Sequence, residues 1–237
     1  MSAQKMMVYT ADPDGKWLYR VGGISALVLG MAYIVIIALY VPVGAPPSGV
    51  EARLTYLAGN TTVWWSILSF SVVTDFLFVP VALSLYLALK GINRNAMLLA
   101  TVCVGLFIIL DLGITWTNYA SLMTLSGNYA AAANASQKAI IVAAASYPSA
   151  VLESSLLFVY NTLTLAIGIL ITGCVMLEGI FSKSTGYLGI VTGLLGIVSV
   201  VGSFFISSLS VTIIIASILT TVWVLLVGFR LYKLGQP

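Results

Sequence analysis

"VALSLYLALKGINRNAMLLATVCVGLF" occupies residues 81–107 and decides how this chain is arranged. In it, two apolar runs flank a short connection, KGINRN, which carries two basic side chains. Each run continues outward for long enough to span the hydrocarbon core of a bilayer, which takes about 20 apolar residues. A connection this short predicts two neighbouring antiparallel helices that both cross the membrane.

The composition of the whole chain leads to the same fold class. Of 237 residues, 60% are hydrophobic and 7% are charged, against about 25% charged in a typical soluble domain. The sequence therefore predicts an all-α integral membrane protein whose surroundings are the lipid bilayer. Histidine is absent, which removes the commonest general base and metal ligand. We expect no metal, no cofactor and, because no basic cluster is present, no nucleic-acid partner.

Apolar runs separated by polar segments predict six spanning helices in a single domain of residues 1–237. Their expected ranges are residues 18–41, 63–89, 96–122, 151–177, 187–206 and 209–231. The division between the last two rests on the polar segment SSLS at residues 207–210.

Basic residues predict the orientation of this bundle. With the N-terminus in the cytoplasm, the outer segments hold only Arg53 and Lys138. The inner segments hold the other basic residues, which are Lys5, Lys16, Arg20, Lys90, Arg94, Lys183, Arg230 and Lys233. This positive-inside bias predicts a cell-membrane protein with both termini in the cytoplasm.

The two longer outer loops each predict a short surface helix. Residues 49–58 begin within SGVE (residues 48–51), which matches a capping box, and residues 129–146 are rich in alanine, the best helix former. The same loops contain glycosylation sequons at Asn60 and Asn134.

Three acidic residues, Asp75, Asp111 and Glu153, lie within the predicted helices. An ionised acid at the centre of a bilayer costs about 2.5–3.5 kcal/mol even on the most lenient scale. At about 1.5 Å per residue, Asp75 lies about 18 Å and Asp111 about 17 Å below the outer ends of their helices. Because these helices are neighbours, we expect the two carboxyl groups to meet.

Other polar and aromatic side chains follow these acids at helical spacing. Asn118 lies seven residues after Asp111, and Trp116 lies between them. Tyr160 and Asn161 come seven and eight residues after Glu153. Together they predict a ligand-binding cavity between the helices at residues 63–89, 96–122 and 151–177, lined by Asp75, Asp111, Glu153, Asn118, Tyr160, Asn161 and Trp116.

Structural explanations for the same residues remain open. A protonated Asp75 or Asp111 would join two helices by hydrogen bonds, since burial favours the neutral acid. Glu153 would be stabilised by the helix dipole in a first helical turn. Trp64 and Trp65 are expected in the aromatic belt at the membrane interface.

A stripe of glycine marks the helix at residues 187–206 and the turn before it. Gly186, Gly189, Gly193 and Gly196 recur at three and four residues and so share one face. Small residues allow membrane helices to approach closely. We expect this face to pack within the bundle, with a homo-oligomer or a membrane partner as the alternative.

Three segments carry a resemblance to a known family. They are "GKWLYRVGGISALVLGMAYIVIIALY" (residues 15–40), "LKGINRNAMLLATVCVGLF" (residues 89–107) and "FSKSTGYLGIVTGLLGIVSVVG" (residues 181–202). With a basic residue before a glycine-containing first helix and short basic inner loops, the chain resembles a family of small prokaryotic six-helix membrane proteins, the domain of unknown function 4386. The resemblance implies the six-helix fold and no particular activity.

Three functions fit these observations. The first is binding or transport of a small cationic, protonatable or lipid-like ligand by the acidic helices, because the spans contain acids and no bases at that depth. The second is a non-catalytic scaffold or subunit of a membrane complex. The third is a membrane enzyme in which buried Asp75 and Asp111 divide acid and base roles.

Overall fold

The computed structural model describes residues 15–236, and every regular element in this part of the chain is a helix. Five helical segments are long and apolar enough to cross a membrane, which agrees with the prediction of an all-helical membrane protein. The elements in chain order are α1 (Lys16–Val43), α2 (Val50–Gly59), α3 (Thr61–Leu110), the π-helix η2 (Asp111–Trp116), α4 (Thr117–Ala131), α5 (Ala135–Glu153), α6 (Ser155–Phe158), the π-helix η3 (Val159–Leu163), α7 (Thr164–Met176), α8 (Lys183–Val201), the 3-10 helices η4 (Gly202–Phe204) and η5 (Ser207–Val211), and α9 (Thr212–Leu234).

The longest segment, Thr61–Ala131, is bent back on itself at Asn93. There the backbone leaves the helical conformation (φ −146°, ψ 92°), and the side-chain oxygen of Asn93 accepts a hydrogen bond from the backbone N–H of Ala96 at 3.0 Å. This is the geometry of a helix N-cap. The turn falls inside the expected connection at residues 90–95 and separates a first arm (residues 61–92) from a second arm (residues 94–131). Phe78 and Phe107 meet edge to face across the two arms, with ring centroids 5.5 Å apart.

The region between the second arm and α7 differs from the expected boundaries. The single helix expected at residues 151–177 is broken at Ser154, which is extended (φ −69°, ψ 135°) and accepts a hydrogen bond from the backbone N–H of Leu156. Residues 151–153 instead end α5, which contains most of the surface helix expected at residues 129–146. Ser154 can begin a new helix because its hydroxyl replaces a lost backbone partner.

The short helix expected at residues 49–58 is present as α2, but its start differs from the expected capping box. Its N-cap is Gly49, with φ +89° and no side-chain cap. Glycine suits this position because it alone adopts positive φ without steric cost. Glu51 does not reach back to the start of the helix; it accepts a hydrogen bond from the hydroxyl of Tyr129.

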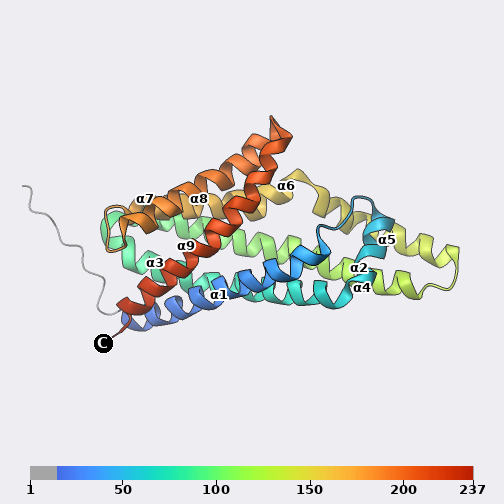
Figure 1. Cartoon of the computed structure of the whole chain (residues 1–237), viewed down its shortest axis with the longest axis horizontal. Helices are drawn as coiled ribbons and strands as arrows, with labels where there is room; N and C mark the ends of the chain where they lie inside the picture. Colours follow the sequence, from blue (N-terminus) through green and yellow to red (C-terminus); the bar gives the residue numbers. More distant parts are fainter. Residues whose placement is uncertain (1–14, 237) are drawn as a thin grey trace, which may run out of the picture.

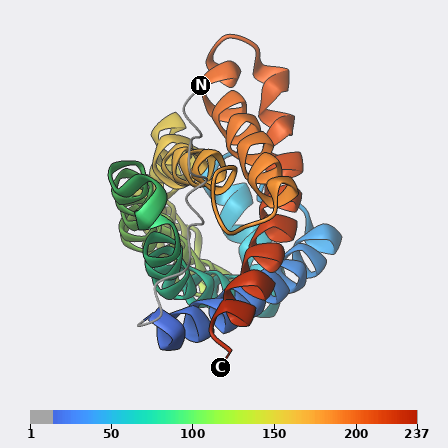
Figure 2. The same ribbon diagram turned by 90° about the vertical axis from the view of Figure 1, so that its left-hand side faces the viewer.

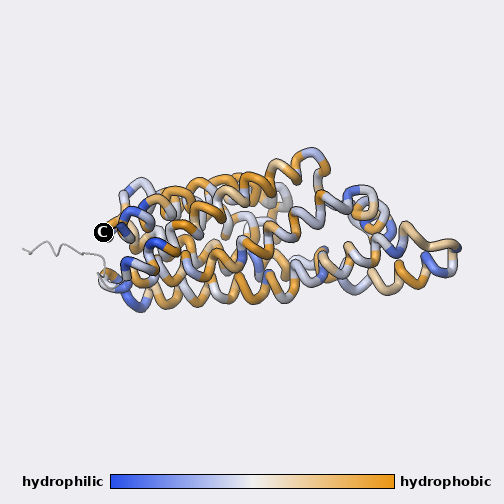
Figure 3. Tube along the Cα trace, turned by 90° about the horizontal axis from the view of Figure 1, so that it is seen from below, coloured by the Kyte–Doolittle hydropathy of each residue, from blue (hydrophilic) through white to orange (hydrophobic). Residues whose placement is uncertain are grey.

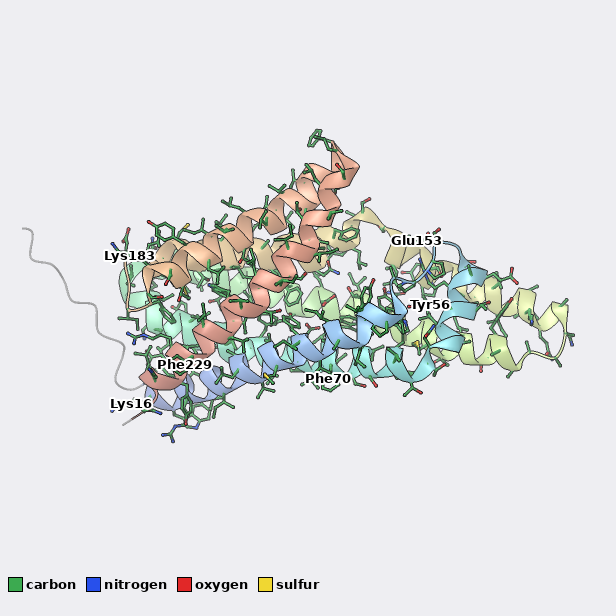
Figure 4. The ribbon with its side chains drawn as sticks, viewed as in Figure 1. Lys16, Tyr56, Phe70, Glu153, Lys183 and Phe229 are labelled. Atoms are coloured by element: carbon green, nitrogen blue, oxygen red, sulfur yellow. The ribbon has the colours of Figure 1, made fainter. Side chains whose placement is uncertain are left out.

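The helices form an elongated bundle (Figure 1). The C-terminus, the start of α1, the turn between the arms of α3 and the connection from α7 to α8 lie at one end, where Lys16 and Lys183 are labelled in Figure 4. The opposite end is built by α2, α5 and the end of α4. Seen along the bundle, α1, α3, α7, α8 and α9 surround a common centre (Figure 2). Apolar segments dominate the middle of the bundle, and hydrophilic ones gather towards its ends (Figure 3).

The glycine stripe of α8 lies against α7 and α9. A Cβ added to Gly193 would come within 2.6 Å of Leu170 Cβ, and one added to Gly196 within 2.7 Å of Ala166 Cβ. A Cβ on Gly189 would meet the indole nitrogen of Trp223 at 2.7 Å, and one on Gly186 would meet Leu177 at 2.8 Å. This face is therefore covered by neighbouring helices of the same chain.

Candidate functional site

Asp75 and Asp111 lie together inside the bundle, on the first and second arms of the hairpin. Their exposed fractions are 2% and 5%. No Lys or Arg among residues 15–236 forms an ion pair with either of them. The two acids therefore lie close together, as their expected depths predict. No basic side chain of the described chain neutralises them.

One donor, the indole N–H of Trp116, serves both acids. It donates to Asp75 Oδ2 at 2.9 Å and to Asp111 Oδ2 at 3.1 Å. The two carboxylate oxygens can thus be no more than 6.0 Å apart, which is the sum of these two distances. The indole bridges the two arms and closes the acid pair on one side.

The π-helix η2 explains how Trp116 reaches Asp111. These residues are five apart, and in an α-helix a five-residue step turns the side chain by roughly 140°, away from the same face. A π-helix closes its turn over five residues, so Asp111 and Trp116 stack one above the other. The wider turn brings donor and acceptor onto one side of the helix.

Two side chains bond to carbonyl groups of the π turn. Thr117 Oγ1 donates to the carbonyl of Leu112 at 2.8 Å, and Asn118 Nδ2 donates to that of Ile114 at 2.7 Å. Buried or lipid-facing carbonyls need such partners. Asn118 was expected on the Asp111 face from its seven-residue spacing; in the structure its amide bonds to its own helix, because the π turn changes the register that the spacing assumed.

A second π-helix, η3, packs against η2. It contains Tyr160 and Asn161, and Asn161 lies near the carboxyl group of Asp111. The side-chain oxygen of Asn161 accepts a hydrogen bond from Thr162 at 3.0 Å, and the carbonyl of Tyr160 accepts one from the hydroxyl of Thr164. π turns occur frequently at functional sites, and here two of them meet beside the acid pair.

Some polar atoms at this site are not fully satisfied within residues 15–236. Oδ1 of Asp111 and Oγ1 of Thr115 form no well-aligned hydrogen bond, although Thr115, which is 4% exposed, lies beside the Asp111 carboxyl group. Tyr33 of α1 approaches from the other side, near Thr74 and both acids. Buried polar atoms normally have hydrogen-bond partners, so this cluster can accept a further donor.

Aromatic rings continue from the acid pair towards α2. Trp116 packs against Tyr119, with centroids 5.8 Å apart, and Tyr119 stacks on Trp64 at 5.3 Å and 14°. Trp64 then donates its N–H to the hydroxyl of Tyr56 at 3.1 Å. Trp64 is 4% exposed, whereas its neighbour Trp65 is 40% exposed, and the place of both in an interfacial belt stays a prediction. We call Trp116, Tyr119, Trp64 and Tyr56 the aromatic column.

Glu153 lies apart from the acid pair, near Tyr56 in Figure 4. It accepts a hydrogen bond from Arg53 Nη2 at 2.6 Å and one from the backbone N–H of Gly49 at 3.3 Å. Arg53 is 6% exposed and also donates to the carbonyl of Ser149 at 3.2 Å. Glu153 thus joins α5 to α2, a role that its position in the sequence did not predict.

Residue counts give the distance between the acid pair and the end of the bundle that carries Lys90 and Arg94. Asp75 precedes Lys90 by 15 residues and Asp111 follows Arg94 by 17, which correspond to about 22 and about 26 Å of helix. The second arm continues to Ala131 and is about 57 Å long in total. The helix of the second arm thus ends nine residues after the expected end at residue 122, whereas the first arm begins only two residues before the expected start at residue 63.

A small apolar cavity lies next to this site, deeper in the bundle. Its volume is about 20 Å³, enough for about one water molecule. Phe78, one turn from Asp75, contributes to its wall together with Met97, Gly168 and Trp223. No acidic residue lines it, so it differs from the acidic cavity that the sequence predicted.

The asparagines of the two sequons both have structural contacts. Asn60 donates from its amide to the carbonyl of Tyr56 at 2.9 Å. Asn134 caps α5 by accepting the N–H of Gln137 at 2.9 Å. Glycosylation at either position stays a prediction.

Comparison with known proteins gives one match. A family model described as a domain of unknown function (DUF4386) matches residues 21–235. No curated protein and no solved structure matches the chain.

Proposed function

The chain belongs to the DUF4386 family of domains of unknown function, and on this premise we propose that it is a six-crossing protein of a prokaryotic cell membrane that binds or transports a small cationic, protonatable or lipid-like ligand at Asp75 and Asp111. The ligand enters the bundle between the two arms of α3 and η3. Both termini lie in the cytoplasm, and the lipid bilayer covers the apolar sides of the bundle.

Six crossings follow from the turn at Asn93 if each arm of the hairpin crosses the bilayer once. The first arm contains 32 residues and the part of the second arm up to Trp116 contains 23. About 20 residues suffice for one crossing. The basic residues at the turn, Lys90 and Arg94, favour a cytoplasmic position for it.

The observation that carries the binding proposal is the shortage of positive charge at the acid pair. Two carboxyl groups share the indole N–H of Trp116, and the other neighbours of Asp111, the side chains of Thr115 and Asn161, carry no charge. Two unit negative charges about 6 Å apart repel each other by roughly 3 kcal/mol at an effective dielectric constant of about 20. A proton or a ligand cation between them removes this repulsion, so the pair favours a positively charged guest.

The aromatic column supports access from the α2 end of the bundle. Its rings lie between the acid pair and Arg53, and they include Trp64 and Tyr119, stacked in parallel. Aromatic faces attract cations by about 0.5–2 kcal/mol. A cation that enters from this side meets such faces before it reaches the carboxyl groups.

The experiment is a thermal-unfolding screen of the purified protein in detergent against inorganic cations and small amines. We expect at least one cation to raise the melting temperature of the wild type, and this rise to disappear in Asp75→Asn and in Asp111→Asn. Glu178→Gln is the matched control, since it also replaces a carboxylate by an amide but at an exposed position; its response should equal that of the wild type. A rise that persists in both Asn variants, or no rise with any cation, contradicts the proposal.

The second candidate is a scaffold or subunit of a membrane complex. It is favoured by the hydrogen bonds from Trp116 to both acids, because these bonds also join the two arms of the hairpin without any ligand. In that case Asp75→Asn and Asp111→Asn lower the melting temperature, and no cation raises it in any variant. The screen therefore separates the two candidates.

A further inference from the structure

The position of Trp116 indicates what kind of cation the acid pair takes. Its N–H points at both carboxyl groups, with nearly equal distances of 2.9 and 3.1 Å. A ligand whose own N–H groups lay at this position, between the two carboxyl groups, would make the same hydrogen bonds. Unlike an ammonium group, however, the indole carries no charge, so it satisfies hydrogen bonding without balancing the acids.

We infer that the indole N–H of Trp116 occupies the site of the ligand's own donor, so that the ligand is a primary ammonium cation and Trp116 is displaced when it binds. This inference rests on the proposed function and names its ligand class and a specificity-determining residue. Three N–H groups of a primary ammonium reach Asp75, Asp111 and one further acceptor.

The other oxygen of the Asp111 carboxyl group supplies that further acceptor. Asp111 Oδ1 accepts no well-formed hydrogen bond within the described chain, although the side chains of Thr115 and Asn161 lie close to this carboxyl group, and Asp111 and Thr115 are 5% and 4% exposed. One indole N–H cannot serve Asp75 Oδ2, Asp111 Oδ2 and Asp111 Oδ1 at once. An ammonium group has three donors, which matches two carboxyl groups and one additional oxygen.

The π-helix gives Trp116 a way to leave. The stacking of Trp116 over Asp111 depends on the extra residue in the turn of η2. If that turn tightens to an α-helix, Trp116 rotates by roughly 140° relative to Asp111 and its N–H leaves the acid pair. The bond from Thr117 to the carbonyl of Leu112, five residues earlier, favours the wide turn and so holds Trp116 in place.

Three probes separate charge from N–H donation. Methylammonium chloride carries one charge and three N–H groups, tetramethylammonium chloride carries the charge without N–H, and sodium chloride provides a bare metal cation. We expect methylammonium to bind the wild-type protein in detergent, as measured by calorimetric titration at constant ionic strength. Tetramethylammonium and sodium should bind at least tenfold more weakly, because neither donates a hydrogen bond to the carboxyl groups.

The decisive variant is Trp116→Phe, which retains a ring but removes the competing N–H. We expect it to bind methylammonium about tenfold more tightly than the wild type, since the ligand no longer displaces a hydrogen bond to a charged group. Trp65→Phe is the control. It removes the indole N–H of an exposed tryptophan on the first arm, outside the aromatic column, and it should leave the affinity unchanged.

A second variant keeps the inference testable if Trp116→Phe fails to fold. Thr117→Val removes the hydroxyl that favours the π turn, at an exposed position, and should also strengthen methylammonium binding. The inference is overturned if neither variant that folds binds more tightly than the wild type, or if tetramethylammonium or sodium binds as well as methylammonium. If tetramethylammonium or sodium binds and this binding still requires Asp75 and Asp111, the proposed function stands although the inference fails. If none of the three probes binds, the inference is contradicted and the broader cation screen decides the function.

Discussion

At the scale of single residues, Arg53 carries the largest electrostatic cost outside the acid pair. Its side chain is 7% exposed, whereas that of Glu153 is 45% exposed. A buried guanidinium group has lost most of its hydration and depends on the partners that replace water. The carboxylate of Glu153 and the carbonyl of Ser149 are such partners, so the charge of Arg53 ties α2 to α5.

A double-mutant cycle measures this pair. Glu153→Gln should lower the free energy of unfolding by about 1–3 kcal/mol, because it leaves the buried charge of Arg53 without a counter-charge. Arg53→Met should also destabilise, but the double variant should lose less than the sum of the two single losses. The readout is denaturant-induced unfolding in detergent. Losses that add to within about 0.5 kcal/mol would show that the two side chains are not coupled.

The residue scale also shows where prediction from the sequence stops. Asp75 and Asp111 were expected to meet, because helix rise and a short connection fix relative depth. The contact of Trp116 with both was not expected, because nothing in an apolar run marks a π turn. Thr117 and Asn118, which bond to carbonyls of that turn, were the available signal.

At the scale of helices, close approach depends on glycine at a few positions of α8. The Cβ that alanine would add at position 193 lies 2.7 Å from the carbonyl oxygen of Ala166, a backbone atom that cannot rotate away. By contrast, a Cβ at Gly105 in α3 meets nothing within 4 Å. The two glycines have the same helical conformation and opposite surroundings.

These two positions give a prediction of opposite sign. Gly193→Ala should lower the free energy of unfolding by about 1–3 kcal/mol, the usual cost of overpacking. Gly105→Ala should raise it by about 0.5–1 kcal/mol, because alanine favours the helix and occupies open space. Both are measured by the same unfolding assay in detergent. Two changes of the same sign would mean that contacts between α7 and α8 do not limit stability.

Helix boundaries were predictable where polar residues interrupt an apolar run and not elsewhere. The connection at residues 90–95 falls at a turn because the side chain of Asn93 caps the helix that follows, and the polar segment at residues 207–210 lies in the 3-10 helix η5 between α8 and α9. The break at Ser154 was missed, since a single serine next to Glu153 looks the same as the first turn of a helix. The extension of the second arm to Ala131 was missed because alanine continues a helix in water as well as in lipid.

At the scale of the whole molecule, the bundle is longer than a membrane is thick. The second arm measures about 57 Å, and a hydrocarbon core measures about 30 Å. If the basic residues lie at the cytoplasmic surface, as we propose, the acid pair falls in the outer third of the bilayer and α2, α5 and the end of α4 extend beyond it. The aromatic column would then lie at the outer interface, where Trp and Tyr are favoured, and a ligand from outside would have a short path to Asp75 and Asp111.

The number of crossings decides this arrangement and is open to a direct test. If each arm of α3 crosses once, the turn between α4 and α5 lies outside and the start of α8 lies in the cytoplasm; if residues 61–131 cross only once, both positions are reversed. Starting from Cys103→Ala with Cys174→Ala, Ala133→Cys and Ser184→Cys place one thiol at each position, and both parent residues are exposed. We expect a membrane-impermeant maleimide added to intact cells to label position 133 at once and position 184 only after permeabilisation. The reverse pattern would contradict the proposed topology and remove the outer access route.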